Sequence, residues 1–194
     1  IGNAFLTLAH PDNDKDDRLV AIERDAKTSK AHFNFASVGG NKFVTAGAAE
    51  QNMVCVSQGI GAEEKSHSVL LLELLQQVMI DIIFLLLTAI VSPNRAYDQI
   101  RLVGISASNV KFIGTHSLTG AEDPSHMALE DITMFRAVTG SVILYPSDAV
   151  SAERAVVCAA NHHGLVYIRA TNFGAVPVRL STAFLLTNGN YFFF

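Results

Sequence analysis

Val142-Ile143-Leu144-Tyr145 and Leu165-Val166-Tyr167-Ile168 stand on either side of a helical pattern that runs from Ser147 to Asn161. Both tetrapeptides have the aliphatic and aromatic character and the length of short buried strands. Ser147 or Asp148 can cap the helix between them. The pattern therefore predicts two parallel strands joined by a helix. The positions of this helix expected to face inward are Val150, Ala155, Val156 and Ala159.

The same rhythm continues towards the N-terminus. Strand candidates lie at Leu19–Ile22, Phe43–Thr45 and Val110–Gly114, and helical patterns separate most of them. Short apolar strands that alternate with helices of about ten to fifteen residues are typical of an α/β fold. We therefore predict a doubly wound, mostly parallel sheet flanked by helices, with ligands at the carboxyl ends of the strands.

Length, charge and cysteine content narrow the function classes. The chain has 194 residues, of which 49% are hydrophobic, so it suits one domain. Its net charge is −4, and its Lys and Arg residues are scattered, which argues against a nucleic-acid partner. Cys55 and Cys158 fall in apolar helical patterns and form no CxxC pair, so we expect core thiols in a reducing compartment. Residues 1–10 lack a signal-peptide pattern, so we expect the protein to be located in the cytoplasm. Because the chain starts at Ile1 and not at Met, we expect it to be a piece of a larger protein or an incomplete gene product.

Two patterns that could hold a metal are better explained otherwise. Asp12, Asp14 and Asp16 have the ligand spacing of a calcium loop, but Asp17 stands where the sharp turn needs Gly. We interpret them as an acidic loop before the first strand. His162 and His163 stand together in a turn, and we expect both at the surface. No metal site is therefore predicted.

Ala48-Ala49-Glu50-Gln51-Asn52-Met53-Val54 places one carboxylate among small and apolar residues. It follows the strand candidate Phe43–Thr45, and Glu50 would open a helix that runs to about Gly59. A Glu in a first helical turn can simply be favoured by the helix dipole. The alternative is a catalytic acid mounted at the end of a strand.

Three further segments favour the second alternative, in the order Arg95-Ala96-Tyr97-Asp98-Gln99-Ile100-Arg101, Met127–Arg136 and Tyr145–Val150. Together with the Glu50 segment, they resemble the pyrimidine-binding domain of animal-type transketolases, over about residues 17–65 and 95–171. The resemblance implies an enzyme that uses thiamine diphosphate to move a two-carbon glycolaldehyde unit between ketose and aldose phosphates in the pentose phosphate pathway. It also implies a homodimer, because family active sites lie between two subunits. Mg²⁺ and the diphosphate would be held by a domain of the partner subunit.

The resemblance implies roles for individual residues. Glu50 matches the Glu that hydrogen-bonds a ring nitrogen of the aminopyrimidine and favours the imino tautomer that activates the thiazolium carbon. His126 matches a position near cofactor and substrate. The substrate-binding positions are matched by Ser29, His116, Asp123 and Arg169, with Ser29 and Arg169 as phosphate contacts.

Two regions depart from the family. We predict a pyrimidine-binding domain over residues 1–171, with a divergent insert at 66–94, and a divergent tail at 172–194. The insert replaces an aromatic run of Phe-x-x-Phe-Phe type, which stacks on the aminopyrimidine, with a long apolar run. A translated intron or altered exon would explain it; a membrane helix is the other interpretation, although Glu73 and Asp81 near its middle oppose insertion. The competing function is that of a truncated, inactive paralogue that keeps only a dimerising or binding module.

Overall fold

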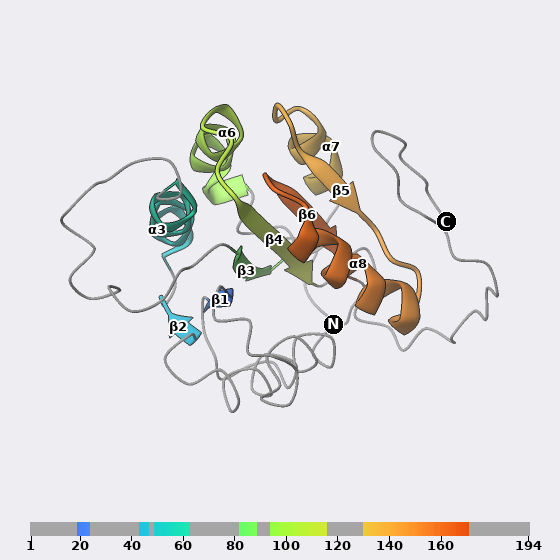
Figure 1. The fold of residues 1–194 in the computed structure, drawn as a ribbon. Helices are drawn as coiled ribbons and strands as arrows, with labels where there is room; N and C mark the ends of the chain where they lie inside the picture. The colour runs from blue at the N-terminus through green and yellow to red at the C-terminus, as the bar shows by residue number, and fades with distance from the viewer. Residues whose placement is uncertain are drawn as a thin grey trace.

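The computed structural model describes residues 19–23, 43–46, 49–62, 82–88, 94–115 and 130–170. Within these ranges, six parallel strands form one sheet in the order β2-β1-β3-β4-β6-β5 (Figure 1). The non-sequential order shows that the chain crosses over between strands, as in a doubly wound fold. The strands are β1 (Leu19–Glu23), β2 (Phe43–Thr45), β3 (Ile82–Thr88), β4 (Val110–Thr115), β5 (Val142–Leu144) and β6 (Val166–Arg169). The helices are α3 (Glu50–Ala62), α6 (Tyr97–Ile105), α7 (Asp131–Arg136) and α8 (Ala149–Asn161).

The structure confirms the predicted α/β class and the five predicted strands, and it adds β3. This strand lies inside the segment predicted to be a divergent insert, and it pairs with β1 and with β4. A central parallel strand is normally covered on both faces, so it reads as a continuous apolar run. The run Ile82–Leu87 is therefore explained by its place in the sheet. Across the described ranges, no helix is long and apolar enough to span a membrane.

Helix α8 begins as predicted, and one of its predicted inward positions is wrong. Asp148 is the N-cap: its Oδ1 accepts a hydrogen bond from the Ser151 backbone N–H at 2.7 Å. In return, the Ser151 hydroxyl oxygen accepts a hydrogen bond from the Asp148 backbone N–H. Val150 is 43% exposed, and Ala152 is buried instead. The reason is that the buried stripe has the spacing i, i+3, i+4, i+7, which Val150 does not fit. The stripe consists of Ala152, Ala155, Val156 and Ala159.

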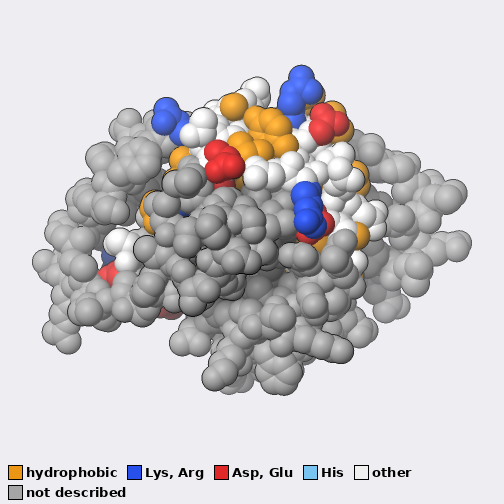
Figure 2. Space-filling model, turned by 180° about the vertical axis from the view of Figure 1, so that it is seen from behind, with side chains coloured by type: hydrophobic (Ala, Val, Ile, Leu, Met, Phe, Trp, Pro, Cys, Tyr) orange, Lys and Arg blue, Asp and Glu red, His pale blue; other side chains and the backbone are white. Residues whose placement is uncertain are grey.

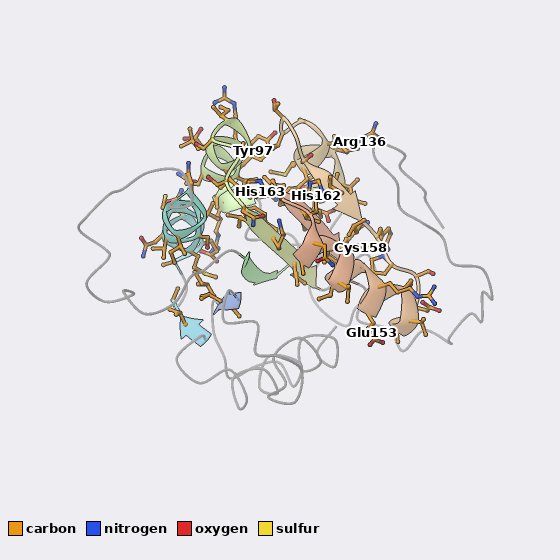
Figure 3. All side chains as sticks on the ribbon, in the orientation of Figure 1. Tyr97, Arg136, Glu153, Cys158, His162 and His163 are labelled. Carbon is orange, nitrogen blue, oxygen red and sulfur yellow. The ribbon has the colours of Figure 1, made fainter. Side chains whose placement is uncertain are left out.

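The predicted burial of the two cysteines is also wrong. Cys55 on α3 and Cys158 on α8 are both exposed. Cys158 is labelled on α8 in Figure 3. Each lies beside a buried stripe, next to Val54 and Ala159 respectively, but on the outer surface of its helix. An apolar helical pattern shows that a cysteine lies on a helix. Its exposure depends on the direction in which its side chain points around the helix axis.

The core packs the two helices α3 and α6 together and against the sheet. Met53 and Val54 of α3, and Ile100 and Val103 of α6, have no exposed surface. At the far end of this helix pair, the Gln58 side chain donates to Ser106 Oγ at 3.0 Å. The first turns of both helices are thereby held in fixed positions beside the sheet.

Lys111 is a buried charge near the start of β4. Its Nζ donates to the backbone oxygens of His162 and Gly164, both at 2.6 Å, and to Asn109 Oδ1 at 2.5 Å. Burial lowers the pKa of Lys111 to about 7. These contacts tie the carboxyl end of α8 to β4. His162 and His163 themselves are exposed, as predicted.

Candidate functional site

Glu50 is the first residue of α3, five residues after Thr45, the last residue of β2. Its side chain is buried, with 5% of its surface exposed. A carboxylate in the first turn is favoured by the positive end of the helix dipole. The position matches the expectation for a ligand-binding acid, because α3 starts from the carboxyl end of a parallel strand.

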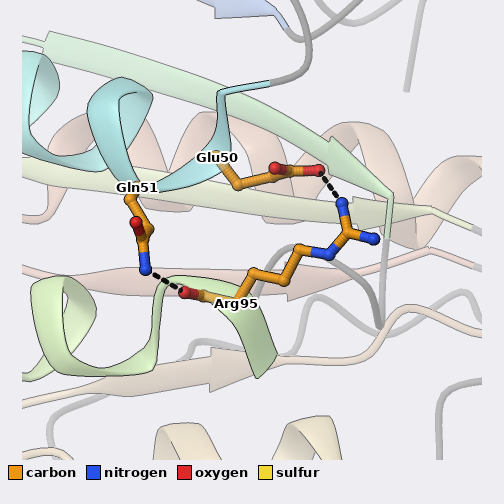
Figure 4. A network of polar contacts seen from close by, with 3 residues as sticks. All are labelled: Glu50, Gln51 and Arg95. Carbon is orange, nitrogen blue, oxygen red and sulfur yellow. Dashed lines mark hydrogen bonds and ion pairs between the residues drawn. The ribbon is translucent and has the colours of Figure 1, made fainter.

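Arg95 faces Glu50 from the turn before α6 (Figure 4). Its Nη1 lies 3.3 Å from Glu50 Oε1, and its backbone oxygen accepts a hydrogen bond from Gln51 Nε2 at 3.0 Å. The Arg95 side chain is 59% exposed, whereas that of Glu50 is 6% exposed. The ion pair is thus open on the arginine side, where water screens it. We call this pair the open pair.

The open pair has a definite chemical capacity. The buried carboxylate of Glu50 can accept a hydrogen bond from a ligand nitrogen, which would take the place of Arg95 while the guanidinium turns towards solvent and is hydrated there. A nitrogen heterocycle placed against Glu50 would fit this donor and acceptor set. Within the described ranges, no group of three or more His, Cys, Asp or Glu side chains could hold a metal ion.

A second carboxylate–arginine pair lies at the carboxyl end of β6. Arg169 Nε is 3.2 Å from Asp131 Oδ2, and the two side chains are 4% and 0% exposed. The Tyr167 hydroxyl donates to the same Oδ2 at 2.6 Å. Burial, reinforced by the charge of Asp131, raises the pKa of Tyr167 well above its usual value, so the hydroxyl stays protonated and donates. We call Asp131–Arg169 the closed pair.

The burial of Arg169 bears on its predicted role as a phosphate contact. A charge-assisted hydrogen bond to phosphate is worth about 1.5 to 3 kcal/mol. Removing the partner of a buried charge costs about 3 to 5 kcal/mol, which is more. The pair with Asp131 uses only Nε of the five N–H donors of the guanidinium, so a phosphate contact by the other N–H groups would not require the pair to break. The phosphate role stays a prediction, and the structure gives Arg169 an internal partner.

The structure thus places two of the predicted site residues and adds others. Glu50 begins α3, which follows β2, and Arg169 ends β6. Three strands, β1, β3 and β4, lie between β2 and β6 in the sheet. Arg95 and Asp131 were not predicted, although both stand inside sequence segments that carry the family resemblance. The remaining predicted residues, Ser29, His116, Asp123 and His126, lie outside the described ranges.

Figure 2 shows how the charged side chains of the described residues are distributed on one face. The Lys and Arg side chains drawn there for the described residues stand apart from one another, with acidic and apolar side chains between them. This agrees with the net charge of −4.

The family model for the transketolase pyrimidine-binding domain matches residues 10–172, so the chain belongs to this family. Among curated relatives, transketolase-like protein 1 of Bos taurus is 36% identical over 88% of this chain and 26% of its own length. Human transketolase is 34% identical over 88% of this chain and 24% of its own length. The chain spans about a quarter of the length of these relatives.

Solved structures agree with the predicted fold. A structure described as "Split gene transketolase, inactive beta4 tetramer" superposes with a TM-score of 0.70 at 30% identity. The match covers 93% of this chain and 52% of that one. Transketolase from Campylobacter jejuni superposes with a TM-score of 0.67 at 18% identity, covering 88% of this chain and 25% of that one, which shows the fold alone. The family resemblance and the fold class predicted from the sequence are both confirmed.

Proposed function

We propose that this chain supplies the pyrimidine-binding half of a thiamine-diphosphate site in a transketolase. The observation that carries the proposal is Glu50, a buried carboxylate at the start of α3 inside the matched family segment. The reaction is the transfer of a two-carbon glycolaldehyde unit from a ketose phosphate to an aldose phosphate, in the pentose phosphate pathway. The location that suits this pathway is the cytoplasm.

The residues around Glu50 fit the aminopyrimidine ring. Glu50 would accept a hydrogen bond from the ring and hold a proton between its carboxylate and the ring nitrogen. Arg95 would move aside or stay as a counter-ion at the solvent side of the carboxylate. When bound, thiamine diphosphate supplies the electron sink that lets a carbon–carbon bond beside a carbonyl break. The diphosphate and Mg²⁺ are assigned to the diphosphate-binding domain of a partner subunit in a homodimer.

The sugar phosphate is assigned to the residues predicted from the family resemblance. These are His116 and Asp123 for hydroxyl groups, Ser29 for the phosphate, and His126 between cofactor and substrate. Arg169 belongs to the same predicted set as a second phosphate contact, and its Nε also pairs with Asp131.

A second candidate function is that of an inactive paralogue that serves only as a dimerising or binding module. Residues 66–94 favour it, because they lack the Phe-x-x-Phe-Phe run expected to stack on the aminopyrimidine. A further support is the split gene transketolase, whose structure is that of an inactive tetramer. For this reason we expect the purified 194-residue chain alone to transfer no glycolaldehyde.

A pair of chimeras separates the two functions. In the first, residues 10–172 replace the matching domain of human transketolase. The second, which we call the restored enzyme, also carries the human sequence in place of residues 66–94. If the chain supplies the pyrimidine-binding half as it stands, transfer from xylulose 5-phosphate to ribose 5-phosphate is expected in both chimeras. If it is the inactive paralogue, transfer is expected in the restored enzyme alone. Activity in both chimeras would reject the inactive paralogue, and a folded but inactive restored enzyme would reject the transketolase proposal.

A further inference from the structure

Asn109 and Lys111 form a buried polar cluster with the turn that joins α8 to β6. Their exposed fractions are 6% and 0%. Lys111 Nζ donates to the backbone oxygens of His162 and Gly164 at 2.6 Å and to Asn109 Oδ1 at 2.5 Å. Asn109 Oδ1 also accepts a hydrogen bond from the Gly164 backbone N–H at 3.0 Å. We call these four contacts the latch.

The latch acts on a turn with a special backbone conformation. Gly164 has a φ of +121°, which L side chains rarely adopt. His162 is the C-cap of α8, and Figure 3 labels it at this end of the helix. The latch holds two carbonyl groups and one N–H group of the turn. It therefore ties the carboxyl end of α8 to the residues at the start of β4.

The latch uses all three protons of the Lys111 ammonium group. An ammonium group has three N–H donors, one for each of the three oxygens, whereas a neutral amine has two donors and a lone pair. In the amine form, one oxygen therefore faces a lone pair. If the Asn109 amide turned over to donate to that lone pair, the Gly164 N–H would lose its acceptor. In either arrangement, the latch loses one hydrogen bond.

The surroundings of Lys111 favour loss of one proton. Burial lowers the pKa of Lys111 to about 7. Within the described ranges, the titratable or charged groups on the adjoining turn, α8 and β6 are His162, His163, Glu153, Arg154, Cys158, Tyr167 and Arg169. The carboxylate among them, Glu153, is exposed and lies nine residues before His162, about 13 Å along the helix. The pKa of His162 is lowered by burial and then by the charges of Lys111 and His163.

We propose that Asn109, Lys111 and the turn from His162 to Gly164 form a proton-dependent latch, closed when the Lys111 amine carries its proton and loosened when that proton passes to solvent water. Loosening affects the turn and the carboxyl end of α8. Loss of the proton also removes a buried charge, so the folded chain as a whole still gains stability over the unfolded chain, in which Lys111 stays protonated. The latch lies at the amino ends of β4 and β6, so it does not depend on the chemistry proposed for Glu50.

Hydrogen exchange on the 194-residue chain between pH 6 and 9 tests the latch, with each rate divided by that of an unstructured peptide at the same pH. Protection of the Gly164 N–H should fall about tenfold over this range. Protection of the Ile100 N–H, which donates to Ala96 O at 2.9 Å within α6, should change less than about twofold. An NMR titration of the Lys111 side chain should show loss of its proton in the same range. Constant protection at Gly164, or a Lys111 that is still protonated at pH 9, would overturn the proposal.

Three variants identify the group that senses the proton. Asn109→Asp keeps an oxygen for both donors and gives Lys111 a counter-ion, so protection at Gly164 should stay constant from pH 6 to 9. Lys111→Met should lower this protection about tenfold at pH 6 and remove its pH dependence. His163→Gln, which removes an exposed titratable neighbour, should keep the wild-type dependence. If Lys111→Met does not fold, the other two variants still decide. A fall of wild-type size in Asn109→Asp, or no fall in His163→Gln, would show that another group opens the turn.

Discussion

The open pair and the closed pair have the same chemistry and nearly the same geometry, yet they differ in exposure. Glu50–Arg95 is 3.3 Å long with side chains 6% and 59% exposed, and Asp131–Arg169 is 3.2 Å long with side chains 0% and 4% exposed. Distance alone would rank the two pairs equally. Exposure separates them, because water can replace Arg95 at its carboxylate and cannot reach Arg169.

The comparison explains how one domain can use an acid–arginine pair in two ways. A carboxylate whose partner is free to enter solvent remains available to a ligand. A carboxylate whose partner is buried is committed to the fold. On this basis we propose Glu50 for the binding chemistry, whereas Asp131 is committed to the fold.

The largest expected effect comes from Glu50→Gln in the restored enzyme. An amide cannot take and return a proton, so turnover should fall about 10²- to 10⁴-fold, while the nearly isosteric change leaves the circular dichroism spectrum unchanged. The control is Glu153→Gln, at an exposed position of α8, which should keep full turnover. Equal turnover in the two variants would show that Glu50 is not the activating group. The open pair would then have no functional difference from the closed pair.

The next largest effect is expected from Asp131→Asn, measured as the free energy of unfolding in urea. The variant removes the charge of Asp131 from a buried ion pair, which should cost about 3 to 5 kcal/mol. Asp98→Asn, on the exposed side of α6, is the matched control and should stay within about 0.5 kcal/mol of the wild type. A cost below about 1 kcal/mol for Asp131→Asn would mean that the closed pair behaves like a surface pair.

Much of this fold can be predicted from the sequence, because five of its strands are short apolar runs between helical patterns. β3 was missed for a physical reason: it lies within a longer apolar run that continues through Ala89, Ile90 and Val91 beyond Thr88, so no turn residue marks where the strand ends. The exposure of Cys55 and Cys158 could not be predicted either. It depends on a helix rotation of a fraction of a turn, which the spacing of apolar residues does not fix.

The candidate site was predictable in part. Glu50 stood out because it is a lone carboxylate after a strand, inside a segment with a family match. The burial of Arg169 was not predictable, because it depends on the pairing of β6 with β4 and on the position of Asp131 beneath it. These two positions are 38 residues apart in sequence, and no local pattern links them.

Lys111 sharpens the comparison, because it is a buried charge whose Nζ, in the described part of the chain, donates to oxygens of neutral groups at Asn109, His162 and Gly164. Its pKa is lowered from 10.5 to about 7 in the folded chain, so between these values the unfolded chain binds more protons. The free energy of unfolding should therefore rise with pH from about 7 towards 10.5, by up to about 1.4 kcal/mol per pH unit.

The measurement is urea unfolding from pH 7 to 9, compared between the wild type and Lys111→Met, so that contributions from other groups cancel. The lowered pKa of His162 keeps that side chain neutral in this range, so it adds nothing to the slope. Identical pH slopes in both proteins would show that Lys111 stays charged throughout, with its hydrogen bonds outweighing desolvation.

The smallest effect is expected from Arg95→Met, which removes the exposed half of the open pair. Its side chain is 59% exposed, so the free energy of unfolding should change by no more than about 1 kcal/mol, and the difference should shrink as salt is added. The variant keeps the backbone oxygen that accepts from Gln51, so the link between α3 and the start of α6 is retained. A cost as large as that of Asp131→Asn, and insensitive to salt, would mean that Arg95 is committed to Glu50 as firmly as Arg169 is to Asp131. Glu50 would then not be available to a ligand, and the assignment of its carboxylate to the aminopyrimidine would lose its structural basis.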